Sequence, residues 1–430
     1  MAGDDVSEQP HQPHILIVGA GFGGLGCIHT LGQLETPARV TIVDKKDTFT
    51  IGGTWQFVWT GRLSQDKTRW PLSSAALPPM ASLMLNTSVS KLDLAAQKAI
   101  LANGTPIAYD QLVLSPGVVS DGSRIPGLTE HALNLYCFDN VVSQKEQLEH
   151  FSQLAEAKVL ASEKATLLIS IAAVPYQCPV APWEVAFLVD AKLRATGVRE
   201  GARIVITAPN EWPLPDPTRP KFEAEMSAKQ VEFFNNKQLA ALEPNLAHYA
   251  DGTSVAFDLA WAVYPQRAPD FVRDSGLVNA RGFVPVDLQT NRIASEALQL
   301  LQIPAMVKAG TSHVPYCIGD CCWTMIQPEL PHPKAGEFAW QMGANVAKQI
   351  DATCRGEALP PPDKRKGSCF AEAGNGTVLL LEPDLSAVLA DPLNGKPDAR
   401  VSEAPEAAKV EWVNKHLARI FNGSVAPFIS

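Results

Sequence analysis

Short apolar runs alternate with amphipathic stretches along the first part of the chain. Residues 14–18 ("HILIV") are typical of a buried strand, and the glycine-rich stretch that follows is typical of a turn and then a helix with small residues on its face. Residues 39–44 ("RVTIVD") predict the next strand. Two strands joined through one helix form a right-handed βαβ unit.

The same pattern recurs in the middle of the chain. Residues 165–172 ("ATLLISIA") predict a strand, residues 182–196 predict a helix that Gly197 ends, and residues 202–208 ("ARIVITA") predict another strand. These elements indicate a second Rossmann-like block between roughly 130 and 280.

Further elements suggest how the two blocks are connected. A hairpin is predicted around Asn103 and Gly104, and a buried strand at 111–115. A later strand at 313–320 and a helix at 336–351 follow the second block. We therefore expect the first domain to be interrupted by the second and then resumed.

Composition and charge exclude several classes of protein. The 430 residues are 46% hydrophobic, which suffices for two or three domains with buried cores. The net charge is −9 and no run of five like charges occurs, so a nucleic-acid partner is not expected. No apolar stretch reaches 18 residues, and the first 13 residues resemble neither a secretory signal nor a transit peptide. We expect a cytoplasmic protein whose eight cysteines are mostly thiols.

The first turn of the chain carries a dinucleotide motif. Gly19, Gly21 and Gly24 form G-x-G-x-x-G between the first strand and helix, and Asp44, followed by Lys45, ends the next strand 20 residues after the last glycine. Such glycines let the backbone approach a pyrophosphate, the helix N-terminus favours its charge, and the acid binds the ribose hydroxyls. The motif predicts that this domain binds a dinucleotide.

A second pair of segments indicates which dinucleotide this is. Gly319 and Asp320 end a predicted strand, and Lys334 directly precedes a predicted helix. An aspartate there suits a ribitol hydroxyl, and a cation suits the N1/O2 edge of an isoalloxazine ring, where it stabilises the reduced anion. We therefore expect FAD rather than NAD in the first domain.

The corresponding turn of the second domain is unsuited to a nucleotide. Pro175, Pro179 and Pro182 lack amide protons, and Glu184 places a negative charge at the start of the helix. NAD(P)H is therefore not expected to bind there. The same helix start favours a thiolate at Cys178, although a dipole contact contributes only about 0.3–1 kcal/mol.

Several motifs together resemble a known family. "SPG", "IGD" and "PKAG" are similar to segments of the two-dinucleotide-domain disulfide reductase superfamily. "YQCPVAPWE" and "GSCFAEAGNG" resemble the branch that contains sulfide:quinone oxidoreductase and the flavoprotein of flavocytochrome c sulfide dehydrogenase. The resemblance implies that Cys178 and Cys369 form a redox pair, that Glu184 is a carboxylate close to the flavin, and that Cys137 is the third cysteine of quinone-reducing members.

The resemblance also implies an activity and a route for the electrons. Hydrosulfide, or a related small thiol or persulfide, would react with the Cys178–Cys369 pair, and FAD would pass the electrons to a quinone. Residues 47–61 lack the cysteine to which the flavocytochrome type attaches FAD, so the cofactor is expected to be non-covalent unless Cys137 bonds the ring. The histidines usual in quinone-reducing members are missing near Cys137 and after residue 208.

Two alternatives stay open from the sequence. One is an enzyme resembling a type II NADH:quinone oxidoreductase, and the other is a flavin-binding regulatory protein without turnover. Cys317, Cys321 and Cys322 lack a usual metal spacing, so we expect packing there and no metal.

The C-terminal part predicts an interface. Val410, Val413, Leu417 and Ile420 share one face of a helix, which indicates either docking on the protein itself or a monotopic membrane contact. The sequence leaves open whether the chain forms a homo-oligomer.

The predicted fold class is α/β, with two Rossmann-like domains, the second inserted in the first, and a C-terminal α+β interface segment. The expected parts are a disordered lead (1–13), the FAD-binding domain (14–130 and 286–355), the second Rossmann-like domain (131–285) and the C-terminal segment (356–430).

Overall fold

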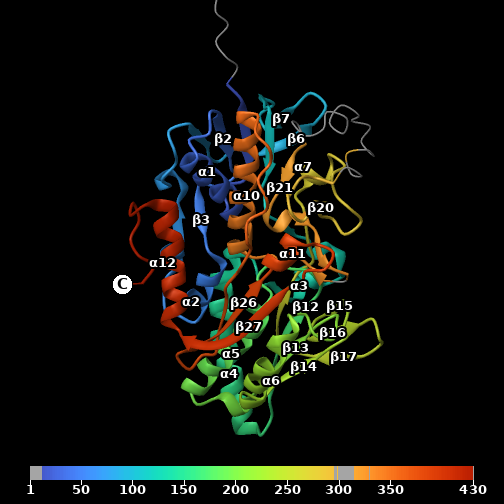
Figure 1. Ribbon diagram of the computed structural model, residues 1–430. Coiled ribbons are helices and arrows are strands. Elements are labelled where there is room, and N and C mark those ends of the chain that lie inside the picture. Colours follow the sequence, from blue (N-terminus) through green and yellow to red (C-terminus); the bar gives the residue numbers. More distant parts are fainter. Residues whose placement is uncertain (1–11, 295–297, 299–313, 329, 430) are drawn as a thin grey trace, which may run out of the picture.

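The computed structural model describes residues 12–294, 298, 314–328 and 330–429 (Figure 1). Most of the predicted lead, and His313 at the start of one predicted strand, lie outside the described residues.

A parallel five-stranded sheet forms the first Rossmann domain, in the order β21-β9-β1-β2-β5. The βαβ unit predicted at the start of the chain is confirmed, because β1 pairs in parallel with β2 from His14 opposite Arg39 to Val18 opposite Val43. The five residues of β1 are all buried, as expected for a strand covered on both faces. The strands are β1 (His14–Val18), β2 (Arg39–Val43), β5 (Ala81–Met84), β9 (Gln111–Leu114) and β21 (Tyr316–Cys317).

Two helices cross closely over this sheet. They are α1 (Phe22–Gln33) and α10 (Gly336–Arg355). A Cβ added at Gly343 would lie 2.1 Å from the carbonyl oxygen of Gly23, and one added at Gly26 would lie 2.6 Å from that of Trp340. The glycines on the predicted helix face therefore allow the two backbones to touch.

The strand predicted at 313–320 is shorter in the structure. Only Tyr316 and Cys317 pair with β9. Gly319 has a left-handed φ of 71° and turns the chain into a short 3-10 helix, which ends the pairing before Asp320.

The second Rossmann domain is a parallel five-stranded sheet in the order β11-β18-β12-β13-β14. In Figure 1 it occupies the lower part of the molecule. Its strands are β11 (Leu133–Asn134), β12 (Ala165–Ile171), β13 (Ala202–Thr207), β14 (Val231–Phe234) and β18 (Leu259–Val263). Its helices are α4 (Val141–Ala161), α5 (Ala181–Ala195) and α6 (Arg219–Ala228).

Several shorter helices and strands lie outside the two parallel sheets. The hairpin predicted around Asn103 and Gly104 is confirmed by the antiparallel pairing of β7 with β8. The remaining short helices are α2 (Trp55–Trp59), α3 (Leu128–His131) and α7 (Asp270–Arg273). The remaining strands are β3 (Thr48–Thr50), β4 (Arg69–Pro71), β6 (Val89–Asp93), β7 (Lys98–Leu101), β8 (Pro106–Ala108), β10 (Val119–Ser120), β15 (Leu239–Glu243), β16 (Leu246–Tyr249), β17 (Ser254–Ala256), β19 (Gln266–Arg267), β20 (Val284–Pro285), β22 (Cys322–Trp323), β23 (Met325–Gln327) and β24 (Leu330–Pro331).

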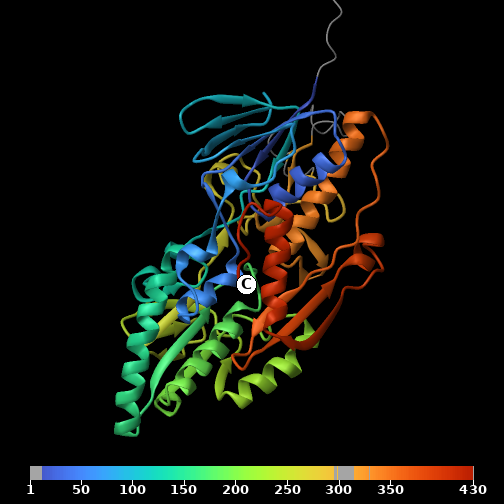
Figure 2. The same ribbon diagram turned by 90° about the vertical axis from the view of Figure 1, so that its left-hand side faces the viewer.

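The C-terminal segment packs against both domains. Its antiparallel sheet runs in the order β25-β26-β27, and Figure 2 shows the C-terminal helix α12 beside the first domain and the strands of this sheet close to the second. These elements are β25 (Cys369–Glu372), β26 (Thr377–Asp384), α11 (Ser386–Ala390), β27 (Asp398–Pro405) and α12 (Ala407–Phe421). The predicted fold class, with one Rossmann-like domain inserted in the other, is confirmed.

Candidate functional site

A cavity of about 800 Å³ lies where the two domains and the C-terminal segment meet. This volume is typical of a cofactor or ligand pocket. Its walls come from the glycine turn, the region of α2, the loop after β12, the N-terminus of α10, β25 and α12. The predicted site residues in its lining are Gly19, Gly21, Asp44, Lys45, Cys137, Cys178, Glu184, Gly319, Asp320, Lys334 and Cys369.

The glycine turn has the geometry that a dinucleotide needs. Gly19 has a φ of 109°, and a Cβ there would lie 2.1 Å from the carbonyl oxygen of Ser115. A Cβ at Gly24 would lie 1.9 Å from the carbonyl oxygen of Gly19, whereas one at Gly21 would meet nothing within 4 Å. The turn is thus packed against backbone at Gly19 and Gly24 and faces open space at Gly21. The residues present fit a pyrophosphate at the N-terminus of α1.

Asp44 and Lys45 lie at the same end of the cavity. The carboxylate of Asp44 accepts hydrogen bonds from the backbone amides of Ala20, at 2.6 Å, and Lys46, at 2.8 Å. These bonds hold the carboxylate beside the glycine turn, and a carboxylate has further lone pairs for a ribose hydroxyl.

Asp320 and Lys334 lie close together at another wall of the cavity. The Lys334 ammonium donates to the backbone carbonyls of Asp320, at 2.6 Å, and Cys322, at 2.9 Å, and lies 4.1 Å from the centre of the Phe283 ring. Burial raises the pKa of Asp320, and the Lys334 charge opposes this rise. The cavity therefore fits FAD at both ends, with a glycine turn for the pyrophosphate and a cationic wall for the ring.

The backbone at Cys178 is in an unusual conformation. Its φ of 50° is left-handed, which costs a non-glycine residue about 1–3 kcal/mol and is common at functional sites. The Cys178 amide donates to the Lys334 carbonyl oxygen at 2.8 Å. Its own carbonyl oxygen accepts from the hydroxyl of Tyr136 at 3.0 Å and from the Ala181 amide at 3.1 Å. The cysteine is thus held by bonds from both domains.

Cys369 begins β25 and lines the same cavity as Cys178. Burial raises the pKa of Cys369 to about 12, and Glu337 adds to this rise. Burial also raises the pKa of Cys178, with contributions from Cys369 and Glu184, while Lys409 opposes the rise. All eight cysteines are thiols in this structure.

Cys137 lines the cavity next to a group of aromatic side chains. It directly precedes Phe138, whose ring lies 5.7 Å from that of Trp55 and 4.4 Å from the guanidinium carbon of Arg69. All four residues belong to the cavity lining. This wall could hold a flat apolar molecule against an aromatic surface.

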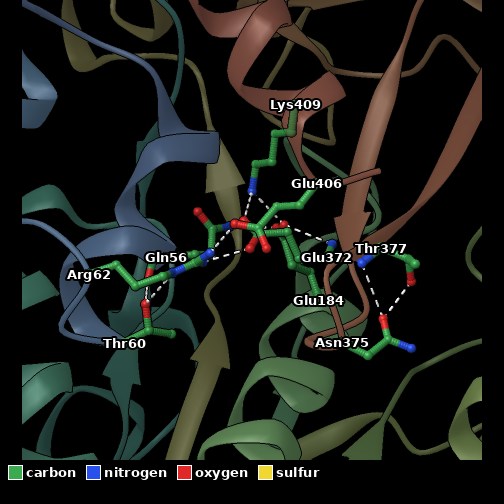
Figure 3. Close-up of polar contacts among 9 residues, drawn as sticks. All are labelled: Gln56, Thr60, Arg62, Glu184, Glu372, Asn375, Thr377, Glu406 and Lys409. Atoms are coloured by element: carbon green, nitrogen blue, oxygen red, sulfur yellow. Dashed lines mark hydrogen bonds and ion pairs between the residues drawn. The ribbon is translucent and has the colours of Figure 1, made fainter. Parts of the chain in front are cut away.

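Glu184 belongs to a buried ionic network (Figure 3). One of its oxygens accepts from Lys409 Nζ at 2.6 Å and from the Glu372 amide at 3.1 Å. The other accepts from Gln56 Nε2 at 2.6 Å. Glu184 and Lys409 both line the cavity, so the network reaches from the cavity wall into the protein.

The network continues from Lys409 toward the surface. Lys409 Nζ also donates to Glu372 Oε1 at 2.7 Å, and Arg62 donates to Glu372 Oε2 at 2.6 Å and to Glu406. Burial raises the pKa of Glu184. Burial alone lowers the pKa of Lys409, but Glu184 and Glu372 outweigh it and hold this pKa above its ordinary value. The carboxylates of Glu184 and Glu372 are therefore balanced by the cations of Lys409 and Arg62.

Sequence reasoning missed most of this network. Lys409 precedes the apolar face of α12 that begins at Val410, yet it is only 2% exposed. The signal in the sequence was weak, because a lysine next to an apolar helical face is usually solvated. The residues missed are Gln56, Arg62, Glu372 and Lys409.

The apolar face of α12 packs on the protein itself. Val413, Leu417 and Ile420 are buried in the core of the first domain, and Val410 packs against it. This face is therefore covered and is not free for the membrane contact that the sequence had left open. In the part of the chain that the structure describes, the longest helices are too polar or too short to cross a bilayer. Within the same residues, no cluster of three metal-ligating side chains occurs.

Comparisons with known proteins agree with this fold. Residues 13–169 match the model of the family described as pyridine nucleotide-disulphide oxidoreductase. This match covers the first part of the first Rossmann domain and the start of the second, and the fold of the described residues agrees with it.

Two sequence relatives have names that include a quinone. The chain is 28% identical over 163 residues to demethylphylloquinone reductase NdbB of Synechocystis, a match that spans 34% of this chain and 38% of that relative. It is 22% identical to a type II NADH:quinone oxidoreductase of Staphylococcus aureus over 89% of this chain and 91% of that one.

Solved structures show a similar arrangement. The sulfide:quinone oxidoreductase of Aquifex aeolicus superposes with a TM-score of 0.71 at 15% identity, covering 96% of each chain. NDH2 of Plasmodium falciparum, solved in complex with NADH, gives a TM-score of 0.62 at 13% identity, covering 86% of this chain and 90% of that one. At these identities the likeness concerns the fold.

Proposed function

We propose that this chain is an FAD-dependent oxidoreductase that oxidises hydrosulfide, or a related small thiol or persulfide, and passes the electrons to a quinone. The observation that carries the proposal is that Cys178 and Cys369, 191 residues apart in sequence, line one cavity together with the glycine turn. The left-handed backbone of Cys178, held from both domains, supports a functional role for its thiol.

The sulfur step uses the two cysteines as a pair. In the oxidised enzyme they form a disulfide, and hydrosulfide attacks one sulfur, which becomes a persulfide while the other leaves as a thiolate. A second hydrosulfide or small thiol would take the outer sulfur of the persulfide and leave both cysteines as thiols, and bound FAD would then accept the two electrons released when their disulfide re-forms. Because burial raises the pKa of both thiols, the free pair holds its protons until the acceptor withdraws electrons.

Glu184 and Lys409 are suited to moving the protons of this step. Both line the cavity, and their ion pair continues through Glu372 to Arg62, which is partly exposed. A proton released in the cavity can therefore pass to the carboxylate of Glu184. In this proposal Glu184 accepts the proton, and Lys409 stabilises the negative charge that Glu184 carries before it does so.

A quinone is the proposed acceptor. The rings of Trp55 and Phe138, next to Cys137, pack edge to face and offer an aromatic surface for such a molecule. The relatives whose names include a quinone support this assignment.

An anaerobic titration with sulfide tests the proposal. We expect sulfide to bleach the visible flavin band of the purified protein, and Cys178→Ser and Cys369→Ser to abolish the bleaching. Cys354→Ser is the matched control, because Cys354 lies on α10 and does not line the cavity. Subsequent addition of decylubiquinone or cytochrome c, with the return of the band followed, identifies the acceptor. Bleaching of both cysteine variants at the wild-type rate contradicts the proposal.

A type II NADH:quinone oxidoreductase activity is the second candidate. Its support is the similarity to such a protein over 89% of the chain. Against it, Pro182 offers no amide in the first turn of α5, and the carboxylate of Glu184 lies in the same turn. The β25 amide of Glu372 already binds this carboxylate. We expect NADH not to reduce the flavin, and reduction by NADH but not by sulfide would favour this candidate.

The third candidate is a flavin-binding regulatory protein without turnover. It predicts that neither sulfide nor NADH bleaches the flavin.

A further inference from the structure

Among the residues that the structure describes, the buried Arg365 has no carboxylate within ion-pair distance. Arg365 lies between α10 and β25 and is 2% exposed. Its guanidinium contacts His332 Nε2 at 3.1 Å and donates to Asn291 Oδ1 at 3.2 Å. Within the described residues, the carboxylate whose charge acts on Arg365 is that of Asp363, and Lys348 binds this carboxylate at 2.8 and 2.9 Å.

The groups around Arg365 do not neutralise its charge. His332 Nδ1 lies 2.8 Å from the Pro333 carbonyl oxygen and donates to it, which leaves Nε2 as an acceptor for Arg365. Burial and the Arg365 charge hold the pKa of His332 well below its usual range, so this histidine is neutral. Burial lowers the pKa of Arg365 to about 10, which still leaves the guanidinium charged at neutral pH.

Arg365 is connected to the cavity lining through His332. His332 is two residues from Lys334, and Lys334 lines the cavity and donates to the carbonyls of Asp320 and Cys322. Burial raises the pKa of Cys322 to about 11, and Lys334 and Arg365 oppose this rise, which indicates that Arg365 is close to Cys322.

A buried, uncompensated cation is costly, and a neutral side chain of similar size would usually stabilise such a site. We propose that Arg365, together with Lys334, provides a fixed positive potential that stabilises the negative charge of the reduced flavin. The step that it favours is the uptake of two electrons and one proton by bound FAD, which leaves one negative charge on the ring. In the test below, dithionite supplies the electrons.

The test measures the flavin and needs no substrate of the enzyme. The two-electron midpoint potential of the bound flavin is determined by anaerobic titration with dithionite against a reference dye. We expect Arg365→Met to shift the potential to a more negative value, and Arg365→Lys, which keeps the charge, to stay close to wild type. Arg355→Met is the control, because Arg355 lies at the surface end of α10 in an ion pair with Asp351.

Sulfite binding gives a second readout. Sulfite adds to oxidised flavin and leaves a negative charge on the ring, so it reports the same potential without electron transfer. We expect its Kd to rise about tenfold in Arg365→Met and to stay unchanged in Arg355→Met.

The potential and the sulfite affinity together test the role of Arg365. A folded Arg365→Met protein that binds FAD stoichiometrically with wild-type potential and sulfite affinity overturns the proposal. If this variant does not fold, Arg365→Gln carries the same expectation, because its amide can still donate to His332 without a charge. Neither readout involves sulfide, NADH or quinone, so the result is independent of the proposed donor and acceptor.

Discussion

The ammonium of Lys409 lies 2.6 Å from a carboxylate oxygen of Glu184, across 225 residues of sequence. This bond joins α12 to the first turn of α5 at the wall of the cavity. The C-terminal segment is therefore part of the site, and both its stability and its protonation depend on this pair.

Replacing Lys409 should destabilise the protein strongly. Lys409→Met leaves Glu184 and Glu372 with one fewer cation in a buried environment, so we expect the free energy of unfolding to fall by about 3–5 kcal/mol. Urea denaturation measures this change. Lys415→Met is the control, because Lys415 is exposed on the same helix. Equal midpoints for the two variants would mean that the network contributes nothing to stability.

The two ends of the glycine turn should respond differently to an added methyl group. Gly21→Ala places a Cβ in open space, so we expect normal folding and weaker FAD binding because the methyl occupies the path to the pyrophosphate. Gly24→Ala drives a Cβ against the Gly19 carbonyl oxygen, so we expect loss of folded protein. Flavin fluorescence and thermal unfolding separate the two effects. Wild-type FAD affinity in Gly21→Ala would contradict the assignment of the turn.

The hydroxyl of Tyr136 should support the strained backbone of Cys178. Tyr136→Phe removes the 3.0 Å hydrogen bond to the Cys178 carbonyl oxygen, and we expect a loss of about 1 kcal/mol in stability and a slower reaction with sulfide. Tyr109→Phe is the matched control, because the buried Tyr109 hydroxyl has no hydrogen-bond partner within the structure described. Its removal should be neutral or stabilising. Unfolding midpoints and stopped-flow bleaching rates measure both variants.

Glu337 should stabilise the protein in a pH-dependent way. Although burial opposes it, the hydrogen bond from His416 and the charges of His416 and Arg419 hold the pKa of Glu337 at about 2. Because this pKa lies below the ordinary glutamate value of 4.5, the stabilisation is present above about pH 4.5 and is lost as the pH falls toward 2.

A comparison of variants isolates this contribution. We expect Glu337→Gln to lower the free energy of unfolding by roughly 2–3 kcal/mol at pH 7, and this gap to shrink at pH 3. Glu411→Gln, at an exposed position of α12, should leave stability unchanged at both values. A gap for Glu337→Gln that stays constant with pH would contradict the expected ionisation.

Local patterns in the sequence were enough to predict the scaffold. The apolar runs gave β1, β2, β12 and β13, and G-x-G-x-x-G with Asp44 gave the dinucleotide turn. These strands and this turn depend on contacts within a single βαβ unit. The alternation of a strand, the conformation of a glycine and the dipole of a helix all act over a few residues.

The tertiary structure alone decided the chemistry at the cavity. Cys178 and Cys369 line one cavity because β25 packs beside α5, and Lys409 reaches Glu184 because α12 docks with its apolar face on the first domain. A solvated lysine and a buried one look alike in a helical pattern. Only the packing of distant segments removes water from such a side chain. Without water, a charged side chain is costly unless an opposite charge or hydrogen-bond partner lies beside it, and this makes its interactions stronger.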